Sequence, residues 1–123
     1  MERDPLTDRV IGLAIDVHRA LGPGLLESAY EACLCRELEL GSISFNRQVH
    51  LSIDYKGLRF ENAYRLDVVV ANQLILEIKV VEKVLPIHEA QLLTYLKLSK
   101  LRTGLLLNLN TPILKDGIRR MVL

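Results

Sequence analysis

The sequence predicts an α/β fold in which a mixed β-sheet is covered by helices on both faces. Strand-like apolar runs occupy the middle of the chain, and periodic helical patterns precede and follow them. A helical pattern also separates the strand-like run at residues 74–80 from the run at residues 104–110. A helical crossover of this kind joins parallel strands, so these two runs are expected to pair in parallel.

Two helices are expected at the start of the chain. Apolar residues at helical spacing form one stripe from Leu6 to Leu21, with Pro5 suited to its first turn. The Gly22-Pro23-Gly24 sequence ends this helix sharply. A second helical pattern covers residues 25–40, and Gly41 is a natural C-terminal stop.

Four strand-like runs follow the two helices. Residues 44–55 alternate between apolar and polar side chains, and a turn at Lys56-Gly57 leads into a short strand at residues 58–61. The third and fourth runs are more apolar and cover residues 64–70 and 74–80. A tight turn around Asn72-Gln73 joins them, which predicts an antiparallel pair.

The last part of the chain is expected to alternate helix, strand and helix. Pro86 suits the first turn of a helix that runs to about residue 100. Residues 104–110 form a further buried strand. Pro112 interrupts the chain before residues 115–122, which we predict to be a short basic helix.

Length and composition are typical of one compact domain that spans residues 1–123. Half of the 123 residues are hydrophobic and 25% are charged, which is enough for a core and excludes wholesale disorder. The formal net charge of +1 excludes the strongly basic balance of a tail-driven nucleic-acid binder. A local basic groove remains compatible with this balance.

The sequence also predicts a cytoplasmic protein that does not enter a membrane. No apolar stretch is long enough for a bilayer span, and the polar, acidic start does not resemble a signal peptide. Cys33 and Cys35 stand two apart in a predicted helix and therefore point to nearly opposite sides. We expect them to be reduced packing residues rather than metal ligands.

The third and fourth predicted strands carry charge where a buried strand should be apolar. Asp67 lies in the third strand, and Glu77 and Lys79 lie in the fourth. A buried carboxylate is costly unless it is protonated, paired or bound to a metal. Because alternate side chains of a strand share a face, Glu77 and Lys79 point one way and Ile78 the other. This group can hold a divalent cation and a water, or it can form a buried ion-pair network without a metal.

The order of these residues resembles the motifs of the PD-(D/E)xK nuclease superfamily. Asp67 followed by Glu77-Ile78-Lys79 resembles its core motif, with Leu66 in place of the usual proline. The segment Gln91-Leu92-Leu93-Thr94-Tyr95 resembles the Q-x-x-x-Y motif of the RecB-like branch. Upstream, Gly24-Leu25-Leu26-Glu27-Ser28-Ala29-Tyr30 is similar to the pattern of the GxxExxY protein family within that superfamily. The resemblance covers nearly the whole chain.

This resemblance implies a restriction-endonuclease-like core and metal-dependent hydrolysis of nucleic acid, with DNA as the favoured substrate. Asp67 and Glu77 would bind Mg²⁺ or Mn²⁺ through hard oxygen atoms, and the backbone carbonyl of Ile78 could add a third ligand. The metal would lower the pKa of a bound water and neutralise charge on the phosphate. Lys79 would orient that water or stabilise the charge that develops in the transition state.

The resemblance also assigns roles to residues on the helices. Glu27 would be the helical acid, a direct or water-mediated metal ligand, although an acid at this position could simply favour the helix dipole. Gln91 would contact the metal-bound water or the nucleic-acid backbone. The remaining candidates for the site wall or for substrate contact are Tyr30, Arg65, His88 and Tyr95. For the tyrosines and the histidine, the alternative is packing or structural hydrogen bonding, and for Arg65 it is charge balance with the acids.

Two other functions are compatible with the sequence. The superfamily includes proteins that have lost catalysis, so the chain could be a silent binding or assembly module in a nucleic-acid-processing complex. A small molecule could instead bind the same cleft, although no phosphate loop or cofactor fingerprint is present. A homodimer would bring two sites together, and the sequence leaves the oligomeric state open.

Overall fold

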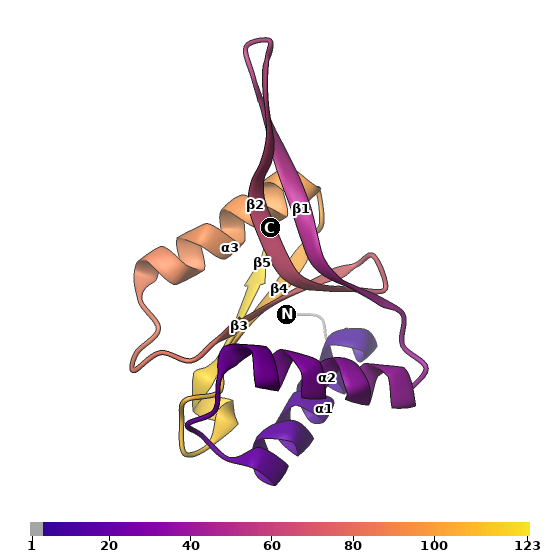
Figure 1. Cartoon of the computed structure of the whole chain (residues 1–123), viewed down its shortest axis with the longest axis vertical. Helices are drawn as coiled ribbons and strands as arrows, with labels where there is room; N and C mark the ends of the chain where they lie inside the picture. Colours follow the sequence, from indigo (N-terminus) through magenta and orange to yellow (C-terminus); the bar gives the residue numbers. More distant parts are fainter. Residues whose placement is uncertain (1–3) are drawn as a thin grey trace.

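A five-stranded mixed sheet lies between two layers of helices (Figure 1). The structure is a computed structural model that describes residues 4–123. The elements, in chain order, are α1 (Pro5–Leu21), α2 (Glu27–Leu40), β1 (Phe45–Tyr55), β2 (Leu58–Val70), β3 (Leu74–Lys79), α3 (Pro86–Ser99), β4 (Thr103–Asn108), a 3₁₀ turn (Leu114–Gly117) and β5 (Ile118–Val122). The predicted α/β class, with a mixed sheet and helices on both faces, is confirmed.

The strands lie side by side in the same order as in the sequence, from β1 at one edge to β5 at the other. Three neighbouring pairs are antiparallel. The exception is β3 with β4, which are parallel and joined by α3. The parallel pairing predicted from the intervening helix is therefore confirmed.

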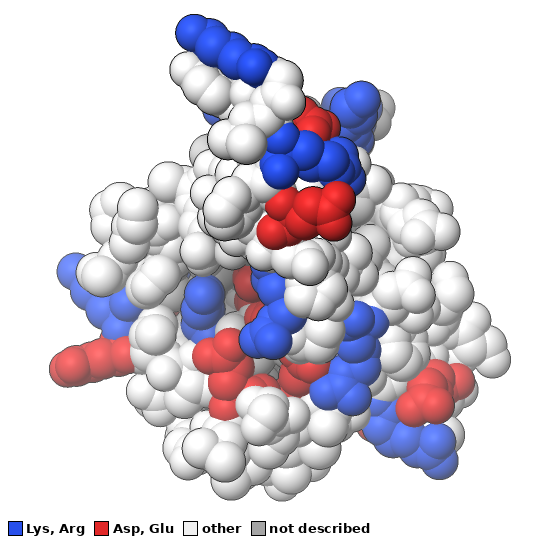
Figure 2. Space-filling model, turned by 45° about the horizontal axis from the view of Figure 1, so that its top comes forward, with Lys and Arg blue, Asp and Glu red and all other residues white. Residues whose placement is uncertain are grey.

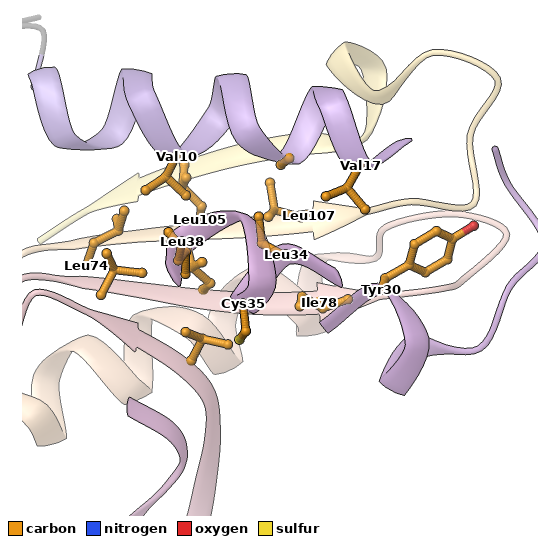
Figure 3. Close-up of a cluster of buried hydrophobic side chains, with 14 of the residues drawn as sticks. Val10, Val17, Tyr30, Leu34, Cys35, Leu38, Leu74, Ile78, Leu105 and Leu107 are labelled. Atoms are coloured by element: carbon orange, nitrogen blue, oxygen red, sulfur yellow. The ribbon is translucent and has the colours of Figure 1, made fainter. Parts of the chain in front are cut away.

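Two apolar clusters lie on opposite faces of the sheet. On one face α1 and α2 pack against Leu76 and Leu107, and Figure 3 shows Val10 and Val17 of α1 pointing into this cluster. On the other face α3 packs against Ile75 and other side chains of the sheet. Burial of each large aliphatic side chain contributes about 1.5–3 kcal/mol, so these clusters fix the sheet between its helices.

The two cysteines are packing residues, as expected, although both contact the same apolar cluster rather than opposite sides of the helix. Cys35 is buried in the cluster beneath α1 and α2, and Cys33 is partly buried at its margin. Both thiols are free. Burial raises the pKa of the Cys35 thiol to about 11, so this side chain is a neutral packing group at physiological pH.

The two separate strands expected at residues 58–61 and 64–70 form one continuous strand, β2, of 13 residues. The register against β1 shifts between Leu51 and Ile53, and Asn62 has a φ of 51°. A bulge thus absorbs the extra residues that appeared in the sequence as an interruption. The β1–β2 hairpin extends well beyond the rest of the sheet (Figure 1).

The prediction of a helix at residues 115–122 is wrong. The chain forms the 3₁₀ turn and then β5, which pairs antiparallel with β4. A short isolated helix is marginal in water, whereas β5 satisfies the open backbone edge of a strand whose centre is fully buried. Gly117 argued against a helix at residues 115–122, because a glycine inside a helix is unfavourable by about 1 kcal/mol relative to alanine.

No helix in the part of the chain that the structure describes is both long enough and apolar enough to cross a membrane.

Candidate functional site

Asp67 and Glu77 lie where β2 and β3 part. The backbone pairing of these strands ends at Val68 and Leu76. Beyond that pair, the N–H of Asp67 donates to Glu77 Oε1 at 3.2 Å, and the N–H of Ile78 donates to Asp67 Oδ2 at 2.8 Å. The two carboxyl groups thus replace the backbone acceptors that a continued ladder would supply. We call this group (Asp67, Glu77 and Ile78) the strand fork.

The carboxyl groups of the strand fork repel each other, with Glu77 buried and Asp67 half-buried. Glu77 is only 5% exposed, and burial followed by repulsion from Asp67 raises its pKa to about 8. Burial also raises the pKa of Asp67. Glu77 therefore holds a proton near neutral pH, and this proton reduces the repulsion between the two groups.

Lys79 supplies the positive charge of the site. It lowers the pKa of Asp67, Glu77 and Glu27, so its ammonium group acts on all three acids. Ile78 is buried in the cluster beneath α1 and α2, which places Glu77 and Lys79 on the other face of β3, as strand alternation predicts.

Asn108 secures the chain just after Lys79. Its side-chain amide donates to the carbonyl of Val81 at 2.9 Å and accepts from the N–H of the same residue at 3.1 Å. The side chain is 2% exposed. The buried amide thus fixes the end of β4 to the segment that leaves β3 and limits the movement of Lys79.

Glu27 is the first residue of α2 and faces Asp67 across an open pocket. Burial and repulsion from Asp67 raise the pKa of Glu27. Figure 2 shows acidic and basic side chains gathered around a hollow at the base of the projecting hairpin. The pocket is lined by Leu26, Glu27, Ser28, Glu31, Gln48, Arg65 and Asp67. Arg65 is exposed at its rim, where it could meet an anionic ligand.

Tyr95 of α3 lies near the acids on the face of the sheet that is opposite to α1 and α2. It is 5% exposed, and burial followed by repulsion from Glu77 and Asp67 raises its pKa to about 12. Its ring packs edge-on against Tyr64, with 5.3 Å between the ring centroids. Gln91 lies one turn earlier on α3 and is half-buried. Within residues 4–123 it makes no hydrogen bond to the acids.

Tyr30 and His88 serve local structure rather than the acidic group. The buried Tyr30 hydroxyl donates to the carbonyl of Gly22 and accepts from the N–H of Leu25, so it holds the loop before α2 (Figure 3). His88 Nδ1 accepts from the N–H of Leu85 at 2.9 Å and caps α3. His88 also lines a different pocket, formed by the segment between β3 and α3.

Sequence reasoning did not identify Glu31 and Gln48 as lining residues of the pocket, or Arg47 as the partner of Glu31. Glu31 is 6% exposed and accepts hydrogen bonds from both of the other side chains. One signal was available, because Glu31 is four residues after Glu27 and thus shares its helix face. Nothing in the sequence indicated that Arg47 and Gln48 would meet it there.

The donor chemistry of the strand fork fits a hard divalent cation. No group of three or more His, Cys, Asp or Glu side chains within residues 4–123 is arranged to hold a metal ion. Two carboxyl groups do converge, and Mg²⁺ is commonly held by one or two carboxylates with water completing its octahedral shell. The chain therefore supplies oxygen ligands of the right type, and waters or a backbone carbonyl would complete the set.

The fold and the strand fork together define an α/β protein of the restriction-endonuclease-like class. The family model of the PD-(D/E)XK nuclease superfamily matches residues 4–121, and the chain belongs to this superfamily. Nucleases of this superfamily act on nucleic acid and generally use divalent metal ions.

Comparisons with individual proteins add little to this assignment. The crystal structure of SSO0001 is similar at 20% identity and a TM-score of 0.43, over 97% of this chain and 77% of that chain. No curated protein sequence matches the chain.

Proposed function

We propose that this protein is a nuclease that hydrolyses phosphodiester bonds with Mg²⁺ or Mn²⁺, and that DNA is its favoured substrate. The observation that carries the proposal is the convergence of the Asp67 and Glu77 carboxyl groups where β2 and β3 part, close enough to Lys79 for its charge to act on both. Strongly perturbed carboxyl groups beside a lysine are typical of functional sites, and they occur here in a chain of a nuclease superfamily. On its Gly24-x-x-Glu27-x-x-Tyr30 pattern we assign the chain to the GxxExxY family.

Asp67 and Glu77 are proposed to bind the metal, with the carbonyl of Ile78 as a further oxygen ligand. The proton on Glu77 relieves part of the repulsion between the two carboxyl groups. A divalent cation would relieve more of it, because two positive charges replace one. When bound, the metal would lower the pKa of a water and offset the charge of the scissile phosphate.

The remaining residues are assigned by their positions. Lys79 would stabilise the charge that develops on the phosphate. Glu27, across the pocket from Asp67, would add negative charge to the metal site directly or through a water. Tyr95 would support Glu77 from the α3 face, and Arg65 at the pocket rim would contact a phosphate. Gln91 is retained as a site-wall residue because it lies one helical turn from Tyr95.

A cleavage assay tests this proposal. The substrates are single- and double-stranded DNA and RNA, each with Mg²⁺, Mn²⁺ or EDTA. We expect cleavage that requires the metal and falls by about 10²–10³-fold in K79A, which lacks the electrostatic stabilisation, and in E77Q, which lacks a charged ligand. R59A is the matched control, since Arg59 pairs with Asp54 and Glu61 on the exposed hairpin. Cleavage that survives in K79A and E77Q would contradict the assignment.

The second candidate is a catalytically silent module that binds nucleic acid or assembles a larger complex. It is favoured by the near-neutral net charge of +1, which is low for a protein that must hold nucleic acid by itself. This candidate predicts a folded protein that retains nucleic acid in a binding assay but leaves it intact with every metal. Nucleic-acid binding that is insensitive to D67N would support it further.

A further inference from the structure

Glu31 joins α2 to β1 through an ion pair in which the glutamate is buried and the arginine is exposed. Its Oε2 accepts from Arg47 Nε at 3.0 Å and from Arg47 Nη2 at 2.7 Å. The side-chain amide of Gln48 lies 2.9 Å from Oε1 and 3.0 Å from Oε2. We call these three residues the Glu31 cluster. Its carboxylate is 8% exposed, whereas the Arg47 side chain is 43% exposed, so the cluster closes the pocket from its outer side.

The carboxylate of Glu31 is already engaged in this arrangement. Its Oε2 lies within hydrogen-bonding distance of three donor nitrogens and its Oε1 of one. Replacing them by a cation would leave the guanidinium of Arg47 facing a metal ion. The cluster must therefore act on the site through other residues.

The first turn of α2 has few other contacts that would hold it in place. Leu26 precedes the helix and provides no side-chain cap, and residues 23–28 are all exposed. The hydroxyl of Tyr30 holds the preceding loop. One helical turn after Glu27, the Glu31 cluster is the polar contact that joins this part of α2 to β1, next to the buried Tyr30.

The backbone of β1 is distorted where Gln48 joins the cluster. Gln48 has a φ of 52°, in the left-handed region, and stands between residues that pair with Val68 and Leu66. This position is directly across from Asp67. A non-glycine residue is strained in this region, and such strain persists only where surrounding contacts impose it. The contact with Glu31 is the one that the structure shows.

We infer that the Glu31 cluster positions the first turn of α2, so that Glu27 lies beside Asp67 and adds its charge to the metal site. The inference rests on the proposed function, because it assigns a role toward the proposed metal. Arg47 and Gln48 are positioning residues in this account, since neither touches the metal or the substrate.

Mn²⁺ affinity, measured by isothermal titration calorimetry on the full chain, tests the inference. Loss of residues that orient metal ligands typically weakens binding about 10–100-fold, so we expect R47A to weaken Mn²⁺ binding by about tenfold. Simple electrostatics predicts the opposite, because removing a cation near the site would tighten Mn²⁺ binding. Unchanged or tighter binding in R47A would overturn the inference. R59A removes a similarly paired arginine away from the pocket and should leave affinity unchanged.

A double-substitution cycle shows whether Arg47 acts through Glu27. E27Q alone should weaken Mn²⁺ binding, and adding R47A to E27Q should weaken it less than about twofold further, since the positioned charge is already gone. Equal effects of R47A in both backgrounds would mean that Arg47 does not act through Glu27. If circular dichroism shows that R47A is unfolded, Q48A replaces it under the same criteria, because it removes only the amide contacts.

Failure of this inference is distinguishable from failure of the proposed function. A wild-type protein that binds no Mn²⁺, or binds it equally well after D67N, would overturn both. A wild-type protein whose binding depends on Asp67 but not on Arg47 would overturn only the role of the Glu31 cluster.

Discussion

At the scale of single residues, the site is explained by the cost of burying charge. Asp67 and Glu77 are retained in a sheet because each carboxyl group accepts a backbone N–H that the parting strands leave without a backbone acceptor. The carboxyl oxygens of these two residues thus both satisfy backbone N–H groups and serve as the proposed metal ligands. Replacing either acid with an apolar residue would both remove a proposed ligand and leave a buried N–H unsatisfied, at a cost of about 1–3 kcal/mol.

The raised pKa of Glu77 makes the stability of the metal-free protein depend on pH. Its pKa is about 8 in the folded protein against an ordinary value of 4.5. Below pH 4.5 both states are protonated, and between these values the folded state binds more protons than the unfolded state. The free energy of unfolding therefore falls as the pH rises from about 4.5 to 8. Each unit by which the pKa of a group differs between the folded and unfolded states changes the free energy of unfolding by about 1.4 kcal/mol. In a domain of this size, such a change shifts the Tm by about 4 °C.

Thermal unfolding in EDTA between pH 5 and pH 8 measures this effect. The wild-type Tm should fall relative to that of E77Q as the pH rises, because glutamine does not titrate. A constant difference between the two proteins across this range would contradict the assignment of a buried, protonated Glu77.

At the scale of elements, the sequence predicted the two strands that carry Asp67 and Glu77 better than it predicted the contacts between α2 and β1 around them. Asp67 and Glu77 could be recognised because charge inside an apolar run violates the expected pattern. Glu31 could not, since a glutamate in an amphipathic helix is ordinary until its partners are known. The left-handed backbone at Gln48 left no sequence signal, because it is imposed by contacts between α2 and β1 rather than by the residue itself.

The turn before β5 depends on a glycine without a side chain. A Cβ at Gly117 would lie 2.2 Å from the carbonyl oxygen of Asn108, so G117A should displace β5 or β4 and destabilise the protein by about 1–3 kcal/mol. The matched control is G12A, because Gly12 is exposed within α1 and a Cβ there meets nothing within 4 Å. That change should stabilise the protein by about 0.5–1 kcal/mol. Urea unfolding of both variants measures the difference, and equal stability would contradict the close contact.

At the scale of the whole molecule, metal binding should stabilise the folded state. A ligand that binds only the folded protein adds RT ln(1 + [L]/Kd), or about 2.7 kcal/mol at a hundredfold excess over Kd. We therefore expect Mn²⁺ to raise the Tm by several degrees, and D67N to abolish the increase. The same measurement with Ca²⁺ is the comparison. A Tm increase with Mn²⁺ but not with Ca²⁺ indicates a site suited to small octahedral ions, whereas equal increases indicate general cation binding. No shift with any of these ions would favour the silent binding module.

The spatial order of the strands, which repeats their order along the chain, has a consequence for synthesis on the ribosome. Each strand after β1 finds one hydrogen-bonding neighbour already made when it emerges. Pairing between consecutive strands closes shorter loops than pairing between distant segments, and shorter loops cost less chain entropy to close. The hairpin and the first half of the sheet can therefore assemble while the C-terminal residues are still in the exit tunnel, with the edge of β3 exposed until β4 arrives.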